Sequence, residues 1–78
     1  MNEAEMKFVS DAIAKYNLQS TENHHTIQIV DFTVYPEEQA NGAQMALKFK
    51  EHRWKGDVET TLEYRNFEQL KNWFNFHT

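Results

Sequence analysis

Few polar residues of this chain are spaced in a way that catalysis or metal binding requires. His24 and His25 are adjacent, so in an extended chain their imidazoles point in opposite directions and do not easily share one metal ion. Glu37 and Glu38 place two carboxylates in a predicted loop, without the opposed environments that separate an acid from a base in catalysis. Neither of the two serines lies in a G-x-S-x-G turn. We therefore predict that the protein is not an enzyme.

Glycine and cysteine usage supports the same prediction. The chain has only two glycines, and predicted turns need both of them, which leaves none for a loop that cradles phosphate groups. It has no cysteine, which excludes a disulfide framework, a thiol nucleophile and cysteine-ligated zinc. The sequence thus predicts that the protein binds no cofactor and no metal ion.

Basic residues gather in one short segment of an otherwise acidic chain. Residues 48–55 carry a net charge of +3, whereas residues 1–47 carry −5 and residues 56–78 carry −2. A tryptophan lies in the same segment, near the tip of a predicted hairpin, where a large aromatic side chain finds little to pack on and indicates a contact surface. The alternative is that this tryptophan folds back over the sheet edge and the lysines only solvate a strand. The candidate partner-binding residues are Lys48, Lys50, Arg53, Trp54 and Lys55.

The segment from Gln44 to Tyr64 predicts two strands joined by a tight turn. Apolar side chains alternate with polar ones on both sides of the turn, so each strand has one apolar and one charged face. A two-residue turn at Lys55 and Gly56 brings the two apolar faces to the same side, and glycine supplies the positive φ that such turns favour. The residues opposite one another in this register are Phe49 and Leu62, Leu47 and Tyr64, and Lys48 and Glu63.

A helix and a strand are predicted before this hairpin. The helix spans about Glu3 to Tyr16, with Asn2 as its N-terminal cap and Asn17 as a left-handed stop. The strand spans 26–35, and its apolar side chains change face near Val30. This change indicates either a β-bulge or a first half that is covered on both sides. The expected pairs with the next strand are Val34 and Met45, Phe32 and Leu47, and Asp31 and Lys48.

A second helix is predicted after the hairpin, from Phe67 to Phe76, with Asn66 and Gln69 as its capping pair. The fold class is therefore α+β: helix, three-stranded antiparallel β-meander, helix, with both helices on the apolar face of the sheet. At 78 residues, we expect residues 1–78 to form a single small domain. On the opposite face, a row of charges should cross the three strands at Asp31, Lys48 and Glu63.

Two known families resemble parts of this pattern. The order of elements resembles the double-stranded RNA-binding domain, although HRWKG and RNFEQ stand where that family has its G-P-x-H and K-K-x-A-K motifs. The segment YRNFEQLKNWF resembles the strand-to-helix segment of a type I anti-CRISPR protein, a small phage-encoded inhibitor, and shares E-Q-L-x-x-W-F with it over seven positions. The second resemblance implies a protein that binds a nucleic-acid-handling complex and blocks it. It assigns fold positions to Leu70, Trp73 and Phe74, and no role to other residues.

These observations together predict a small non-enzymatic protein-binding module, an inhibitor or regulator that occupies the surface of a protein partner. The alternative is a nucleic-acid-binding domain that uses the basic segment Lys48–Lys55 to contact phosphates. No signal peptide opens the sequence, and no apolar run approaches about 18 residues. We therefore expect a cytoplasmic protein that does not interact with a membrane.

Overall fold

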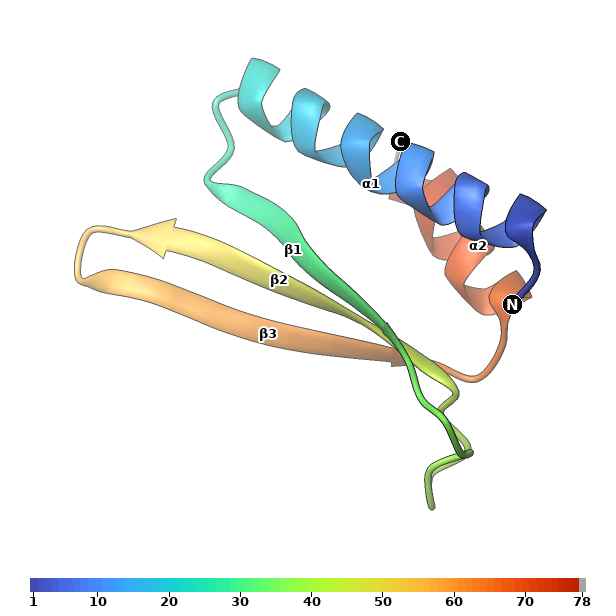
Figure 1. The fold of residues 1–78 in the computed structure, drawn as a ribbon. Helices are drawn as coiled ribbons and strands as arrows, with labels where there is room; N and C mark the ends of the chain where they lie inside the picture. Colours follow the sequence, from blue (N-terminus) through green and yellow to red (C-terminus); the bar gives the residue numbers. More distant parts are fainter. Residues whose placement is uncertain (78) are drawn as a thin grey trace.

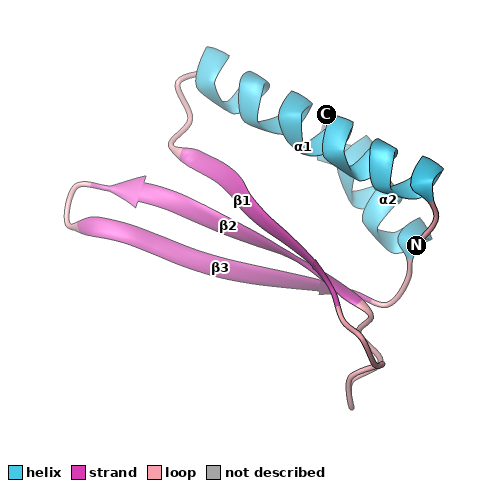
Figure 2. Cartoon of the chain, viewed as in Figure 1, coloured by secondary structure: helices cyan, strands magenta, loops and turns pink. Residues whose placement is uncertain are grey.

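The chain folds as two helices packed on one face of a three-stranded sheet. We describe residues 1–77 in a computed structural model, which contains α1 (Glu3–Glu22), β1 (Ile27–Val34), β2 (Met45–Arg53), β3 (Gly56–Tyr64) and α2 (Phe67–His77). The strands form one antiparallel sheet in the order β1-β2-β3, and both helices lie on the same side of it (Figure 1, Figure 2). The predicted α+β architecture is confirmed. We call the side of the sheet that packs on α1 and α2 the helix-side face, and the opposite side the outer face.

Helix α1 begins as predicted and continues beyond the predicted end. The side chain of Asn2 accepts a hydrogen bond from the N–H of Glu5 at 2.8 Å, and the Glu5 carboxylate accepts one from the N–H of Asn2 at 3.2 Å. The helix ends at Glu22, and the left-handed residue after it is His24, with φ of 58°. The prediction that Asn17 stops the helix is wrong, because its side-chain amide bonds to β1 and its backbone stays helical.

Asn17 fastens α1 to the sheet. Its side-chain oxygen accepts from the N–H of Ile29 at 2.8 Å, and its side-chain nitrogen donates to the C=O of Ile29 at 2.9 Å. We expect Asn17→Ala to lower the free energy of unfolding by about 1–2 kcal/mol, because it leaves two backbone groups of a half-buried strand unsatisfied. Asn75→Ala, at an exposed position of α2, is the matched control and should be neutral or slightly stabilising. Urea denaturation measures both variants, and equal losses would contradict the fastening role.

Strand β1 contains the irregularity that its sequence indicates. The register between β1 and β2 shifts between Ile29 and Asp31, and Val30 is 49% exposed. Of the two explanations, the β-bulge is confirmed, and double-sided covering is not found. Beyond the bulge, the pairs Val34 and Met45, Phe32 and Leu47, and Asp31 and Lys48 are confirmed.

The hairpin forms, but its turn lies one residue earlier than predicted. Arg53 pairs with Gly56, so Trp54 and Lys55 make the turn, and Gly56 is the first residue of β3, with φ of 128°. The positive φ that glycine supplies is thus used where the chain leaves the turn. The predicted register is wrong by two residues, a shift that keeps every side chain on its expected face. The observed pairs include Leu47 with Leu62, Phe49 with Thr60, and Lys48 with Thr61.

Two smaller expectations change with this register. The row of charges predicted across the outer face is interrupted, because Thr61 takes the place expected for Glu63 opposite Lys48. Helix α2 is capped much as expected: Asn66 Oδ1 accepts from the N–H of Gln69 at 3.0 Å. The Gln69 side chain accepts in turn from the N–H of residue 65, one position before the cap.

The core lies over β1 and β2 and leaves most of β3 uncovered. Its fully buried side chains are those of Val9, Leu47, Leu70 and Phe74. Every residue of β3 before Tyr64 is exposed. The expected pair of Leu62 with Phe49 does not form, because Phe49 lies opposite Thr60, and Leu62 is 38% exposed because the two helices cover little of β3. This uncovered strand is the feature on which the candidate site depends.

Tyr64 gives the fold a distinct response to alkaline pH. Its hydroxyl is buried and has no hydrogen-bond partner among residues 1–77. Burial, with a smaller contribution from the charge of ionised Tyr16, raises the pKa of Tyr64 to about 12. The unfolded pKa is about 10, so the stability that this group contributes is complete below about pH 10 and is lost as the pH rises toward the folded value.

We therefore expect the free energy of unfolding to fall between pH 10 and about 12 less steeply in Tyr64→Phe than in the wild type. At neutral pH the variant should be at least as stable, because it removes a buried hydroxyl that lacks a partner. Urea denaturation across this pH range measures the difference. Identical pH profiles for the two proteins would show that Tyr64 does not cause the loss.

Candidate functional site

The β2–β3 hairpin projects from the part of the sheet that the helices cover. Its turn lies at the end of the sheet away from α2 (Figure 1). Trp54 in this turn is 91% exposed, and the Nζ of Lys55 lies 5.2 Å from the centroid of its indole ring. The alternative in which Trp54 folds back over the sheet edge is wrong. The cation–π contact instead holds a large apolar ring in the open.

Ion pairs brace the hairpin next to its turn on both faces. On the helix-side face, Arg53 contacts the Glu51 carboxylate through two nitrogens, at 2.7 and 2.8 Å. On the outer face, His52 Nδ1 lies 2.5 Å from the Asp57 carboxylate. These pairs are exposed, so each contributes little to stability. Their effect at this position is to limit the conformations of the residues that flank the turn.

The structure divides the five predicted site residues into two groups. Arg53, Trp54 and Lys55 are consecutive and line one shallow depression at the tip, which we call the hairpin tip. Because side chains alternate along a strand, Lys48 and Lys50 lie on the outer face, on the opposite side of the sheet from Arg53. Lys48 and Lys50 therefore do not share a surface with Arg53 at the hairpin tip.

Local acids also balance the outer-face lysines. The Nζ of Lys50 lies 3.9 Å from the carboxylate of Glu59. Lys48 lies opposite Asp31 on the neighbouring strand β1. The segment 48–55 is basic in sequence, but in the fold its charges are spread over two faces, and two of its cations, Lys50 and Arg53, contact nearby carboxylates.

A second exposed surface was not predicted from the sequence. On the helix-side face of β3, Val58 and Leu62 are 39% and 38% exposed. Val58 lines the depression at the hairpin tip, whereas Leu62 lines an open groove of about 280 Å³, which we call the β3 groove. Its lining includes Tyr16, Phe49, Thr60, Leu62, Trp73 and His77. The signal in the sequence was Thr60, a polar residue in the apolar phase of β3, which indicates that this phase is incompletely covered.

Aromatic rings form one wall of the β3 groove. The ring centroid of Trp73 lies 5.4 Å from that of Phe49 and 5.6 Å from that of Tyr16. His77 stacks on Trp73 with a centroid distance of 4.2 Å, and its Nδ1 lies 2.9 Å from the Trp73 carbonyl oxygen. These contacts make the wall rigid and apolar, with one imidazole at its rim.

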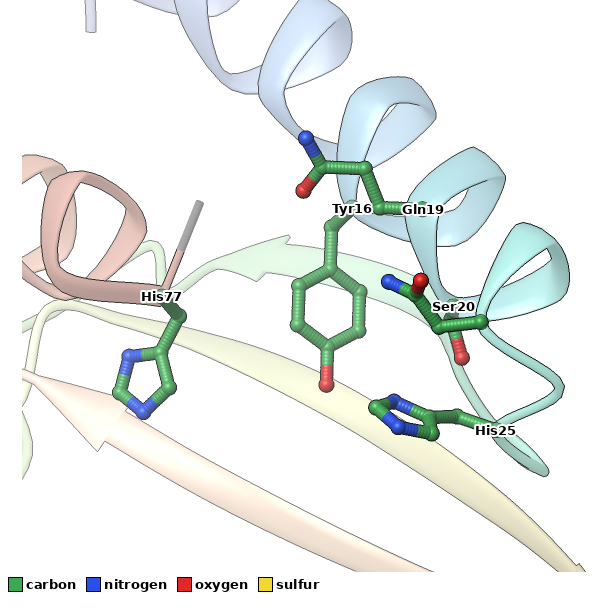
Figure 3. A pocket seen from close by; sticks show the side chains of 6 residues that line it. Tyr16, Gln19, Ser20, His25 and His77 are labelled. Carbon is green, nitrogen blue, oxygen red and sulfur yellow. The ribbon is translucent and has the colours of Figure 1, made fainter.

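A smaller pocket of about 220 Å³ adjoins this groove and shares Tyr16 and His77 with it. The ring of Tyr16 points from α1 toward the sheet, with its hydroxyl between the imidazoles of His25 and His77 (Figure 3). Partial burial raises the pKa of the Tyr16 hydroxyl, which favours its neutral form. Within residues 1–77, no three or more histidine, cysteine, aspartate or glutamate side chains come together as a metal site. The pocket offers hydrogen-bonding groups to a ligand.

Comparisons with known proteins leave the function to be argued from these surfaces. No protein-family model, curated protein or solved structure matches this chain. In the part of the chain that the structure describes, neither helix has the length and apolar character needed to cross a bilayer.

Proposed function

We propose that this protein is a non-enzymatic protein-binding module, an inhibitor or regulator that acts by occupying the surface of a protein partner with its hairpin tip. The observation that carries the proposal is the 91% exposure of Trp54 at the end of a projecting hairpin. Almost all of the apolar surface of this indole ring is in contact with water. A partner that covers the ring removes this surface from water, which favours binding.

The contacts around the hairpin tip favour binding with a small entropic cost. Trp54 is held by Lys55, and Arg53 is held by Glu51. Tryptophan and arginine are the residues most often found as energetic anchors at interfaces. Because their positions are restricted before binding, less side-chain freedom is lost when the complex forms.

We further propose that the partner belongs to a nucleic-acid-handling complex and that the protein acts on it in the cytoplasm. The resemblance of residues 68–74 to an anti-CRISPR segment suggests this class. The net charge of −4 supports it as well. Surfaces that handle nucleic acid are basic, and opposite net charges accelerate the encounter of two proteins at low salt.

Direct binding of nucleic acid is the less favoured alternative. Phosphate contacts require cations that release counterions on binding. In this fold Arg53 and Lys50 already face Glu51 and Glu59, at 2.7 and 3.9 Å. The two outer-face lysines also lie on the opposite side of the sheet from Arg53, so one duplex or single strand does not contact the whole set.

Affinity capture from host lysate, with and without nuclease, tests the proposal. The bait is the wild-type chain, and Trp54→Ala is the matched variant. A protein partner that survives nuclease and is lost with Trp54→Ala is the expected result. If nuclease removes every partner, the chain binds nucleic acid. If both baits retain the same partners, the hairpin tip is not the contact surface.

A further inference from the structure

The outer backbone groups of strand β1 are largely satisfied within the chain. The N–H and C=O of Ile29 both bond to the side-chain amide of Asn17, and the C=O of Ile27 accepts from the hydroxyl of Ser20. The N–H of Phe32 donates to the carboxylate of the residue before it at 2.9 Å. Side chains of α1, which runs beside β1 (Figure 1), therefore close the first half of this edge of the sheet, at Ile27 and Ile29.

The opposite edge, on β3, is open. The N–H of His52 donates to the C=O of Thr26 at 2.9 Å, so the even-numbered residues of β2 face β1 and the odd-numbered ones face β3. The β3 residues that pair with even-numbered positions consequently direct their N–H and C=O groups away from the sheet. They are Asp57, Glu59, Thr61 and Glu63. Within residues 1–77, β3 has no strand beyond it.

The side chains along this open edge differ between its two faces. On the outer face lie the carboxylates of Asp57, Glu59 and Glu63. Asp57 contacts His52, Glu59 contacts Lys50, and Glu63 accepts hydrogen bonds from Tyr35 and Asn41, but all three acids remain exposed. The helix-side face presents Val58 and Leu62, both more than a third exposed, and Leu62 lines the β3 groove. An added strand would therefore meet acids on one of its faces and apolar side chains on the other, at the period-two spacing of a strand.

We propose that the open edge of β3 binds an extended segment of a protein partner in which basic side chains alternate with apolar ones. The segment extends the sheet as a fourth strand, and its main chain pairs with the outward groups of β3. Its basic residues lie opposite the acids of the outer face, and its apolar residues cover Val58 and Leu62. This inference rests on the proposed function, because it names the kind of segment that the partner supplies.

A second copy of the chain fits this edge poorly. In an antiparallel pair of fully overlapping β3 strands, with Gly56 opposite Tyr64 of the second copy, Asp57 lies opposite Glu63 of that copy, and this contact occurs twice. Like charges directly opposite one another destabilise strand pairing. Charge complementarity therefore favours a basic segment over a dimer.

The test uses a synthetic peptide of nine residues, the length of β3, in which lysine alternates with valine. We expect it to bind ¹⁵N-labelled protein and to slow hydrogen exchange at the amides of Asp57, Glu59, Thr61 and Glu63. A peptide in which glutamate replaces lysine should bind roughly tenfold or more weakly, since it meets like charges. Equal binding of the two peptides, or protection only at β1, would overturn the proposal.

Two further changes test pairing through the backbone. N-methylation of the peptide amides that face β3 should weaken binding by roughly tenfold or more, and methylation of the alternate amides should not. Thr61→Pro removes an outward N–H without removing a bond to β2, and it should have the same effect; Thr61→Val is its control. The methylated peptides decide the question if Thr61→Pro does not fold. Concentration-dependent dimerisation that Thr61→Pro abolishes would overturn the proposal in favour of a second copy.

This inference and the proposed function fail in different ways. Used as baits, Trp54→Ala and Thr61→Pro should both lose the captured partner. If only Trp54→Ala loses it, the hairpin-tip proposal stands and the open edge is not the docking site. If only Thr61→Pro loses it, the edge binds the partner and the hairpin tip does not. The peptide assay itself is independent of Trp54, which lies in the turn outside β3.

Discussion

Leu47→Ala is expected to lower the free energy of unfolding by about 2–5 kcal/mol, whereas Leu62→Ala should cost only about 1 kcal/mol. These two leucines lie directly opposite one another on β2 and β3 and project to the same face of the sheet. Leu47 is fully buried, at 0% exposure, and Leu62 is 38% exposed. Truncating Leu47 leaves a cavity that the surrounding side chains fill only partly, while solvent reaches the space left by Leu62.

Urea denaturation at neutral pH measures both variants. A chain of this length has a stability of about 4–12 kcal/mol, so Leu47→Ala is measured at low temperature with added stabilising salt if it is largely unfolded. Because the two substitutions remove the same atoms, the difference between their losses of unfolding free energy reports the effect of the helices, which cover β2 and leave β3 open. Equal losses would mean that a covering element also packs on Leu62 in solution.

Trp54→Ala is expected to weaken binding of the protein partner by about 2 kcal/mol or more, roughly a thirtyfold rise in Kd. The same substitution should change the free energy of unfolding by less than about 0.5 kcal/mol. The binding loss follows from the exposed area of an indole that is held in place by Lys55. The small effect on stability follows because the ring packs on little else in the chain.

Calorimetric titration of the captured partner measures the first effect, and thermal unfolding measures the second. Phe76→Ala is the matched control, because Phe76 is another aromatic side chain with high exposure, 85%, and lies on α2. It should leave the affinity unchanged. A loss of stability with intact binding in Trp54→Ala would show that the tryptophan supports the fold instead of the complex.

The sequence predicted the elements, their order and their faces because these depend on local periodicity. The apolar side chains of β2 have odd residue numbers and those of β3 have even ones, so a residue on the helix-side face of β2 must pair with an even-numbered residue of β3. The observed register meets this condition, for example in the pair Leu47 and Leu62. Periodicity does not choose between registers two residues apart. The sequence predicts Gly56 as the second residue of the turn, but in the structure Gly56 adopts its positive φ as the first residue of β3. Dihedral preference alone does not distinguish these two uses of a glycine.

Features that depend on contacts between distant segments were not predicted. From the sequence alone, Asn17 is a residue type that often ends a helix. Its side-chain amide instead bonds to the backbone of Ile29, a contact that depends on β1 lying beside α1 and that the sequence does not reveal. The exposure of Leu62 likewise depends on where the two helices end over the sheet. For the candidate site, the place of Trp54 near a turn left two alternatives, an exposed contact residue or a ring folded over the sheet edge, and the 91% exposure of Trp54 excludes the second. The separation of Lys50 from Arg53 follows from strand alternation once the register is known.

The closed edge of β1 limits how far the sheet can grow. A sheet with two open edges is a template for stepwise addition, in which each new strand exposes another edge and the product is a filament. Here Asn17 and Ser20 of α1 bond to the outer backbone groups of Ile27 and Ile29, so a full-length strand finds a continuous row of outward groups only beside β3. In the proposed complex, one chain would therefore accept one segment from its partner, and α1, at the opposite edge of the sheet, would limit the stoichiometry.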